Sequence, residues 1–313
     1  MQPPPLPPDP DSLIDRRRLK RHLSVWRILA ILLALVAIGV GVGRLGFYDM
    51  RDHVAVLEVK GIISTDRDRE RALMKLADDS RAKALLVRID SPGGTVVGGE
   101  SLFRQLHAVA AKKPVVAVMG EMAASGGYMV ALAAERIFAR EGTITGSIGV
   151  ILQSADVTGL LAKLGIQPEA IKSAPLKAVP SPLEKLTPEG REATQALVND
   201  MYAMFQDMVA ASRNLPPTKV HELADGRVFT GRQALANGLI DQIGGEPEAR
   251  AWLATRGVPQ SLPARKLDIP REDDFFSGMA DSMVRALTGK TYLSERLTLD
   301  GLVALWHPDF GTR

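Results

Sequence analysis

The 313-residue chain is 46% hydrophobic and 24% charged, which is ordinary for a globular protein and too apolar for a disordered one. It has no cysteine, so a disulfide framework, a thiolate zinc site and a cysteine nucleophile are all excluded. The formal net charge is +3, and residues 1–27 carry the whole excess with six basic and three acidic side chains. The balanced remainder does not favour binding to a phosphate backbone, so we expect no nucleic-acid partner.

The N-terminal part has the pattern of a membrane anchor. Residues 1–22 are proline-rich and then basic. Residues 23–43 follow with about the 20 apolar residues that a bilayer core requires, charged only at Arg27, and we predict a transmembrane helix there. A cleaved signal peptide is the alternative, but the sequence GVGRLGFYDM after the apolar run contains no small-x-small cleavage site. The positive-inside rule places the basic tail in the cytoplasm and the rest of the chain outside it.

From residue 53 onward, apolar runs alternate with amphipathic segments. The periodicity predicts strands at 53–59, 82–89, 114–119 and 136–139, and helices at 67–78, 100–111, 125–134 and 187–213. This alternation is typical of an α/β fold with a mostly parallel sheet, in which ligands bind at the carboxyl ends of the strands. After residue 270 the pattern weakens into two short amphipathic pieces, FFSGMADSMVRAL and LDGLVALW.

Two glycine-rich turns follow predicted strands, at residues 90–95 (DSPGGT) and 120–128 (GEMAASGGY). The small side chains around Ser125 let a substrate carbonyl approach closely, and free amide groups at the start of a helix can stabilise an oxyanion. These features nominate Ser125 as a nucleophile. A plain strand-to-helix loop has the same composition and is the competing interpretation.

A serine nucleophile needs a base, and the sequence does not offer a suitable histidine. His221 begins HELAD, which lacks the second histidine of a zinc-binding helix, and His107 fits a solvent-facing helix position. A lysine held away from water is the other possible base, because burial disfavours the ammonium form. Lys177 is the candidate since SAPLKAVP contains no other charge, although a lysine between prolines is more often an exposed loop residue.

Several stretches together resemble one family, signal peptide peptidase A (SppA), a group of membrane-anchored Ser-Lys peptidases. They run in the family's order over roughly residues 54–250: IDSPGGTV (89–96), VMGEMAASGGYMVALAAERIFA (118–139), GTITGSIGV (142–150), IKSAPLKAVPSP (171–182) and ADGRVFTGRQALANGLID (224–241). The resemblance implies a Clp/crotonase-like core of parallel sheet and flanking helices. We therefore divide the chain into a cytoplasmic tail (1–22), an anchor (23–43), a peptidase domain (47–262) and a C-terminal extension of unknown role (263–313).

Carried over residue by residue, the family's nucleophile falls on Ser125 and its general base on Lys177. Ser147 matches the serine that orients the lysine amine, and Gly94 and Gly126 match the residues whose backbone N–H groups form the oxyanion hole. The resemblance implies a serine endopeptidase of the bacterial cytoplasmic membrane, without cofactor or metal, whose catalytic domain on the outer side degrades cleaved signal peptides at the lipid bilayer. It also implies a ring-like homo-oligomer, in which serine and lysine come from one protomer or from neighbours.

Two other functions remain open at this point. The same fold and its oxyanion amides serve crotonase-like acyl-CoA hydratases and isomerases, but Ser125, Lys177 and export argue against a cytoplasmic acyl-CoA substrate. A membrane scaffold could also keep the fold without any activity. Labelling by an active-site serine probe distinguishes the peptidase from the scaffold.

Overall fold

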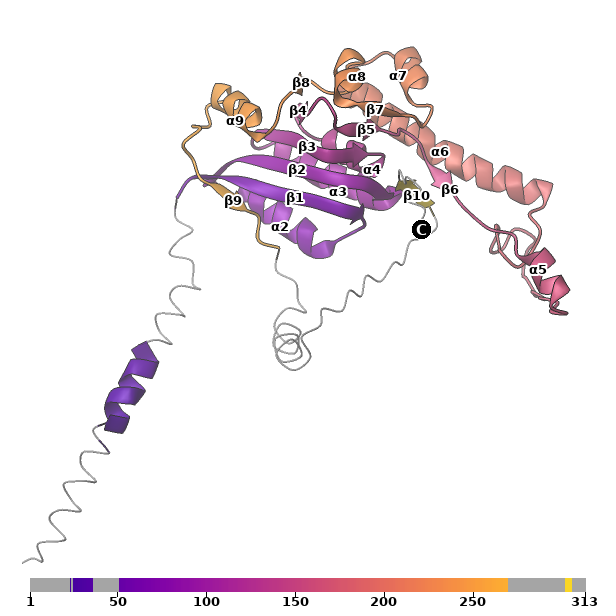
Figure 1. Ribbon diagram of the computed structural model, residues 1–313, viewed down its shortest axis with the longest axis horizontal. Helices are drawn as coiled ribbons and strands as arrows, with labels where there is room; N and C mark the ends of the chain where they lie inside the picture. The colour runs from indigo at the N-terminus through magenta and orange to yellow at the C-terminus, as the bar shows by residue number, and fades with distance from the viewer. Residues whose placement is uncertain (1–22, 24, 36–50, 270–301, 306–313) are drawn as a thin grey trace, which may run out of the picture. The chain divides into compact units, whose positions relative to one another are not determined.

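The computed structural model describes residues 23, 25–35, 51–269 and 302–305, which belong to two compact units, Met1–Arg51 and Asp52–Arg313 (Figure 1). In the first unit, residues 25–35 are helical and exposed. Within the described ranges, no helix has the length and apolar character that crossing a membrane requires. The predicted anchor at 23–43 lies partly outside these ranges, so it stays a prediction.

The second unit is built on one mixed sheet, to which ten strands of the described residues belong. Its centre is parallel, and Figure 1 shows β1, β2 and β3 side by side. The parallel neighbours run in the order β9 (Ala264–Lys266), β1 (His53–Ile63), β2 (Ala82–Thr95), β3 (Val115–Ala124), β4 (Arg136–Ala139) and β8 (Gln242–Ile243).

Four more strands lie near the carboxyl ends of β2 and β3. β5 (Ile144–Gly146) pairs in parallel with the end of β3, and β7 (Val228–Thr230) pairs with β5 in the antiparallel sense. β10 (Leu302–Leu305) is antiparallel to both the end of β2 and β6 (Ile151–Leu152). The additions make the sheet mixed at this edge, where the sequence pattern indicated a mostly parallel one.

Helices cover both faces of the sheet because its strands are apolar on both sides. In β1, Ala55 and Leu57 pack in one core cluster, whereas Val54 and Val56 pack in another, as expected for the twofold side-chain period of a strand. The first cluster lies under α2 (Arg67–Asp78), α3 (Val96–Ala110), α4 (Gly126–Ala131), α6 (Pro188–Arg213), α7 (Pro217–Leu223) and α8 (Gly231–Ala236). The second cluster lies under α9 (Glu246–Thr255).

The α/β class predicted from the sequence is confirmed. α2 and β4 have the expected bounds, and α6 begins one residue later than predicted. α3 begins earlier than predicted, because the Thr95 hydroxyl caps it by accepting a hydrogen bond from the Gly98 amide at 3.0 Å. α4 is shorter than the predicted helix at 125–134, and β2 continues through the first glycine-rich turn as far as Thr95. The second glycine-rich turn begins within β3 and continues into α4, so both turns lie at carboxyl ends of parallel strands.

Candidate active site

Ser125 lies at the junction between β3 and α4, and its backbone is held in an uncommon conformation. Its φ of 53° lies in the left-handed region that side chains other than glycine rarely adopt, and the residue is 1% exposed. The Ser125 amide donates a hydrogen bond to the Gly146 carbonyl at 2.8 Å. All six residues of α4 are buried, so the surrounding structure fixes this turn firmly.

The first glycine-rich turn packs directly against this junction. A Cβ atom on Gly127 would lie 2.8 Å from the Ser91 carbonyl oxygen, and Ser91 pairs with Ala123 between β2 and β3. A Cβ on Gly94 would lie 1.9 Å from the Ile63 carbonyl oxygen, so only glycine fits there. The structure therefore brings Gly94 and Gly126 to the same edge of the sheet as Ser125.

A buried serine that the sequence analysis did not single out holds the first turn in place. The Ser91 hydroxyl donates a hydrogen bond to the Gly61 carbonyl at 2.6 Å and accepts one from the Gly93 amide at 3.1 Å. It thereby joins the end of β1 to the turn that carries Gly94. Its place in DSPGGT was the only signal in the sequence, and a serine is common in turns for purely local reasons.

Ser147 lies immediately after β5, next to the backbone of the nucleophile candidate. It is 8% exposed, has a φ of 50°, and its amide donates a hydrogen bond to the Arg227 carbonyl at 2.8 Å. The preceding residue, Gly146, pairs with Ala124 and supplies the carbonyl that accepts the Ser125 amide. Ser147 is therefore the third predicted residue that the fold places close to Ser125.

Lys177 is placed differently from the other predicted residues. It is exposed and belongs to residues 153–187, which connect β6 to α6 and which we call the arm. No residue of the arm is buried, including those of its helix α5 (Thr158–Lys163). No hydrogen bond joins the side chains of Ser125 and Lys177, both of which are described. Within one chain, Lys177 is therefore exposed whereas Ser125 is buried.

The arm also carries a concentration of exposed apolar side chains. Ile171 is 99% exposed, which is unusual for an isoleucine. Seven large apolar side chains of the arm are each at least 37% exposed: Leu160, Leu164, Ile166, Ile171, Leu176, Leu183 and Leu186. An exposed apolar surface of this kind is typical of a protein interface.

A second feature that the sequence analysis missed is a set of contacts that join α4 and α6 to the segment after α8. The Tyr128 hydroxyl, which is fully buried, donates a hydrogen bond to the Leu239 carbonyl at 2.9 Å, and burial raises the pKa of this phenol above its ordinary range. Two residues further on, Asp241 accepts two hydrogen bonds from the Arg213 guanidinium at 2.8 and 3.0 Å. These partners are far apart in the sequence, so no local pattern could have paired them.

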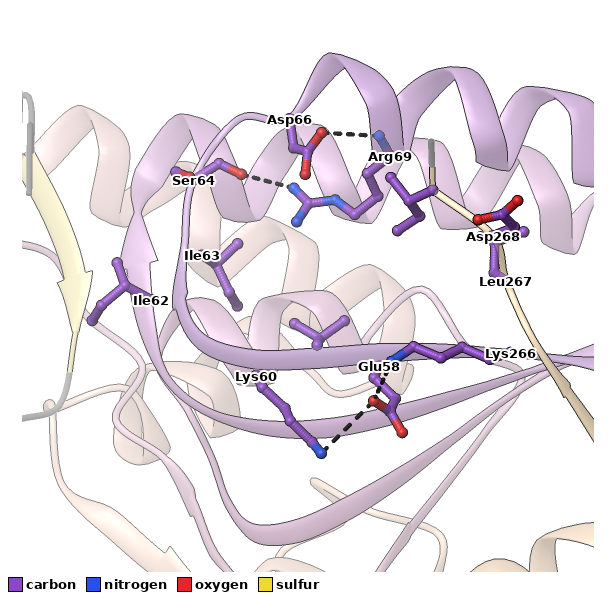
Figure 2. A pocket seen from close by; sticks show the side chains of 12 residues that line it. Glu58, Lys60, Ile62, Ile63, Ser64, Asp66, Arg69, Lys266, Leu267 and Asp268 are labelled. Atoms are coloured by element: carbon purple, nitrogen blue, oxygen red, sulfur yellow. Dashed lines mark hydrogen bonds and ion pairs between the residues drawn. The ribbon is translucent and has the colours of Figure 1, made fainter. Parts of the chain in front are cut away.

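A cavity of about 680 Å³ lies elsewhere, beside the end of β1 and the start of α2 (Figure 2). Figure 2 shows Glu58 between Lys60 and Lys266. The Glu58 carboxylate lies 3.7 Å from the Lys60 amine and 3.1 Å from the Lys266 amine, and the Arg69 guanidinium donates a hydrogen bond to the Ser64 carbonyl at 2.7 Å. The acidic and basic side chains that line it balance, and no predicted site residue is among them. Within residues 51–269, no three histidine or acidic side chains are grouped so as to hold a metal ion.

Known proteins that are similar to this chain identify its family. A protein of Synechocystis sp. named "Putative protease slr0021" is 42% identical over 240 residues, which cover 76% of this chain and 84% of that protein. The model of peptidase family S49 matches residues 107–258. The chain belongs to peptidase family S49. The family expected from the motifs is thereby confirmed, and four of the five predicted site residues lie within the matched range, with Gly94 preceding it.

Two further comparisons cover a smaller part of this chain. The protein of Enterococcus faecium named "Putative signal peptide peptidase SppA" is 39% identical over 180 residues, covering 56% of this chain and about half, 52%, of that protein. A solved ClpP1 mutant from Listeria monocytogenes is similar with a TM-score of 0.40 and 18% identity, covering 61% of this chain and 91% of that one. The finer assignment to a Clp/crotonase-like core therefore stays a prediction.

Proposed function

We propose that this S49 peptidase is a membrane-bound serine endopeptidase with Ser125 as its nucleophile and Lys177 as its general base. The observation that carries the proposal is the buried, strained turn at Ser125, which lies beside the Gly94 turn at the carboxyl ends of β2 and β3. Strained residues that the surrounding structure holds in place are concentrated at active sites.

The reaction is an acyl transfer in two steps. The Lys177 amine takes the proton of the Ser125 hydroxyl, whose oxygen attacks the peptide carbonyl, and the leaving amine departs with a proton. Water then hydrolyses the acyl-enzyme and restores the serine. In both steps the N–H groups of Gly94 and Gly126 stabilise the negative oxygen, and Ser147 orients the amine.

In this proposal, the catalytic pair of Ser125 and Lys177 forms between two copies of the chain. In a single chain Lys177 is exposed on the arm, whereas Ser125 is buried in the sheet-and-helix body. An arm that packs its apolar side chains on a neighbouring protomer would cover them and carry Lys177 to the neighbour's Ser125. Such a contact joins two different surfaces, and repeating it gives a ring where the rotation between neighbours closes.

The substrate class of the proposal follows from the membrane anchor and from the name of one relative. A catalytic unit tethered by residues 23–43 outside the cytoplasm meets apolar peptides at the outer face of the bilayer. The Enterococcus faecium relative is named as a signal peptide peptidase. We infer that cleaved signal peptides are the substrates, without nucleic acid, metal or cofactor as partners.

Complementation between two inactive variants tests the proposal. Ser125→Ala and Lys177→Ala are each expected to lose peptidase activity and labelling by a fluorophosphonate serine probe, while the oligomer remains assembled. Mixed and reassembled together, they are expected to regain activity at roughly a quarter of the sites, because some interfaces pair an intact serine with an intact lysine. Lys163→Ala, on the same arm, is the matched control and keeps wild-type activity.

Three results would contradict the proposal in different ways. If Lys177→Ala keeps full activity, Lys177 is not the general base. If activity does not return on mixing, the serine and the lysine of one site do not come from different protomers. A folded wild-type oligomer that neither cleaves peptides nor reacts with the probe supports the inactive scaffold instead.

A further inference from the structure

A β-bulge near the end of β2 places the first glycine-rich turn. The register between β1 and β2 shifts between residues 60 and 62 of β1, so that Ser91 and Pro92 of β2 lie opposite the single residue Gly61 of β1. Proline suits such a position because it has no backbone N–H to give to the sheet. A bulge bends its strand and redirects the residues that follow, and here Gly94 follows directly.

The Ser91 side chain closes this bulge from within. Its hydroxyl donates a hydrogen bond to the Gly61 carbonyl across the bulge at 2.6 Å and accepts one from the Gly93 amide at 3.1 Å. Ser91 is fully buried, and Gly93 has a φ of 119°, a conformation that glycine adopts without strain. Because glycine has the widest backbone freedom, the hydroxyl restricts a peptide unit that could otherwise turn.

The backbone of Ser91 contacts the other half of the candidate active site. Ser91 pairs with Ala123 of β3, and a Cβ atom on Gly127 would lie 2.8 Å from the Ser91 carbonyl oxygen. Gly127 follows Gly126 in the first turn of α4, which packs against the ends of β2 and β3 (Figure 1). One buried residue thus contacts both the turn that carries Gly94 and the helical turn that carries Gly126.

The spacing of these two turns matters because an oxyanion hole needs both donors aimed at one position. Donors stabilise a developing oxyanion when they lie about 2.7–3.1 Å from it. A misplacement of about 1 Å can lower the rate of an enzyme roughly 100-fold. Gly94 and Gly126 belong to different elements, so the spacing of their N–H groups depends on what holds those elements together.

We propose that Ser91 is a positioning residue, whose hydroxyl sets the distance and direction of the Gly94 N–H group relative to the Gly126 N–H group. The inference rests on the proposed function and adds a residue to the same site. The hydroxyl acts through the turn and does not touch the substrate. Since the donors act most strongly on the charge that develops in the transition state, loss of the hydroxyl lowers kcat and leaves KM nearly unchanged.

The kinetics of Ser91→Ala in the full chain test the inference, with Thr143→Ala as the matched control. The Thr143 hydroxyl is also buried, donates a hydrogen bond to the Gly120 carbonyl at 2.8 Å and accepts one from the Arg140 amide at 3.0 Å. Both substitutions therefore remove one bond to a carbonyl and one from an amide, and the midpoints of urea unfolding should fall by similar amounts.

Only the variant at the bulge is expected to lose catalytic rate. On a short fluorogenic peptide, Ser91→Ala should lower kcat by roughly 10- to 100-fold with KM within about twofold of wild type, whereas Thr143→Ala should keep the wild-type kcat. Ser91→Cys keeps a side chain of similar size with a weaker donor, so its kcat should lie between those of wild type and Ser91→Ala. It also carries the comparison if Ser91→Ala does not fold. An equal fall of kcat at both positions, or a wild-type kcat without the Ser91 hydroxyl, overturns the positioning role.

Hydrogen exchange in the Ser125→Ala background separates this inference from the proposed function, because it needs no catalysis. The amides of Gly93 and Gly94 are expected to exchange faster in Ser125→Ala/Ser91→Ala than in Ser125→Ala/Thr143→Ala. Equal exchange in the two variants overturns the role of Ser91 even if the enzyme is a Ser-Lys peptidase. Faster exchange together with a wild-type enzyme that cleaves no peptide overturns the proposed function, and the positioning role falls with it.

Discussion

Replacing Asp241 by alanine probes the ion pair that ties the C-terminal end of α6 to the segment after α8. The Asp241 carboxylate accepts hydrogen bonds from the Arg213 guanidinium at 2.8 and 3.0 Å and from the Ile137 amide at 2.8 Å. The Arg213 side chain is only 8% exposed, and it keeps just the Gly238 carbonyl as a partner after the substitution. Asp241→Ala therefore leaves a guanidinium group buried without its counter-charge.

Removing one partner of a buried ion pair costs about 3–5 kcal/mol of folding free energy. Because Asp241 itself is 24% exposed, water can reach part of the site, and we expect the lower end, about 3 kcal/mol. For a domain of this size that corresponds to a fall in Tm of roughly 6–12 °C. Asp241→Asn keeps an acceptor for the Ile137 amide, so it is expected to lose roughly half as much.

Thermal and urea unfolding followed by circular dichroism measure the effect. The matched control is Glu222→Ala, which removes the partner of Lys219 at 3.0 Å in an exposed pair with 40% and 65% of the two side chains accessible. An exposed pair contributes about 0–1 kcal/mol, so this variant should unfold almost as wild type does. If Asp241→Ala and Glu222→Ala lose the same small amount, the assignment of a buried, stabilising ion pair is wrong.

Three other expectations can be measured independently. Gly94→Ala should lower the free energy of unfolding, measured in urea, by at least about 1–3 kcal/mol, because the added Cβ would lie 1.9 Å from the Ile63 carbonyl oxygen. Gly142→Ala is the control and should not destabilise the fold, because no atom lies within 4 Å of its added Cβ. Burial raises the pKa of Tyr128 above the ordinary value of 10, so the folded state favours the neutral phenol. The difference in free energy of unfolding between wild type and Tyr128→Phe should therefore be constant below pH 10. Above pH 10 it should shrink by up to about 1.4 kcal/mol per pH unit, because the phenol ionises in the unfolded state first. Peptidase activity should rise from weakly acidic to alkaline pH if an amine is the base, and a flat profile would exclude that role.

Much of the local structure was predictable because its signals are local. The apolar periodicity gave the bounds of α2 and β4, and the glycine-rich stretches located both turns beside Ser125. Their spacing and residue types also pointed to the family, which the comparison with known proteins confirmed. In these cases a residue's neighbours in the sequence are the neighbours that determine its conformation.

The sequence pattern could not predict which parts of the chain surround the predicted site residues. A charge-free stretch nominated Lys177, but burial depends on what packs over a segment, and no residue of the arm is buried by the part of the chain that the structure describes. Tyr128 and its acceptor Leu239, like Arg213 and Asp241, are paired by the fold and not by spacing. The segment LDGLVALW was predicted only as an amphipathic piece, whereas its residues 302–305 form a strand that pairs with β2 and β6.

The amino-acid sequence alone determined the alternation of strands and helices, the two glycine-rich turns and the membership of the S49 family, since each is written in residues that lie close together along the chain. Only the tertiary structure decided that Lys177 stays exposed while Ser125 is buried, and that residues 302–305 lie against Gly94. Those facts depend on which distant segments meet, and the free energy of such contacts comes from burial and pairing that no single stretch of sequence contains.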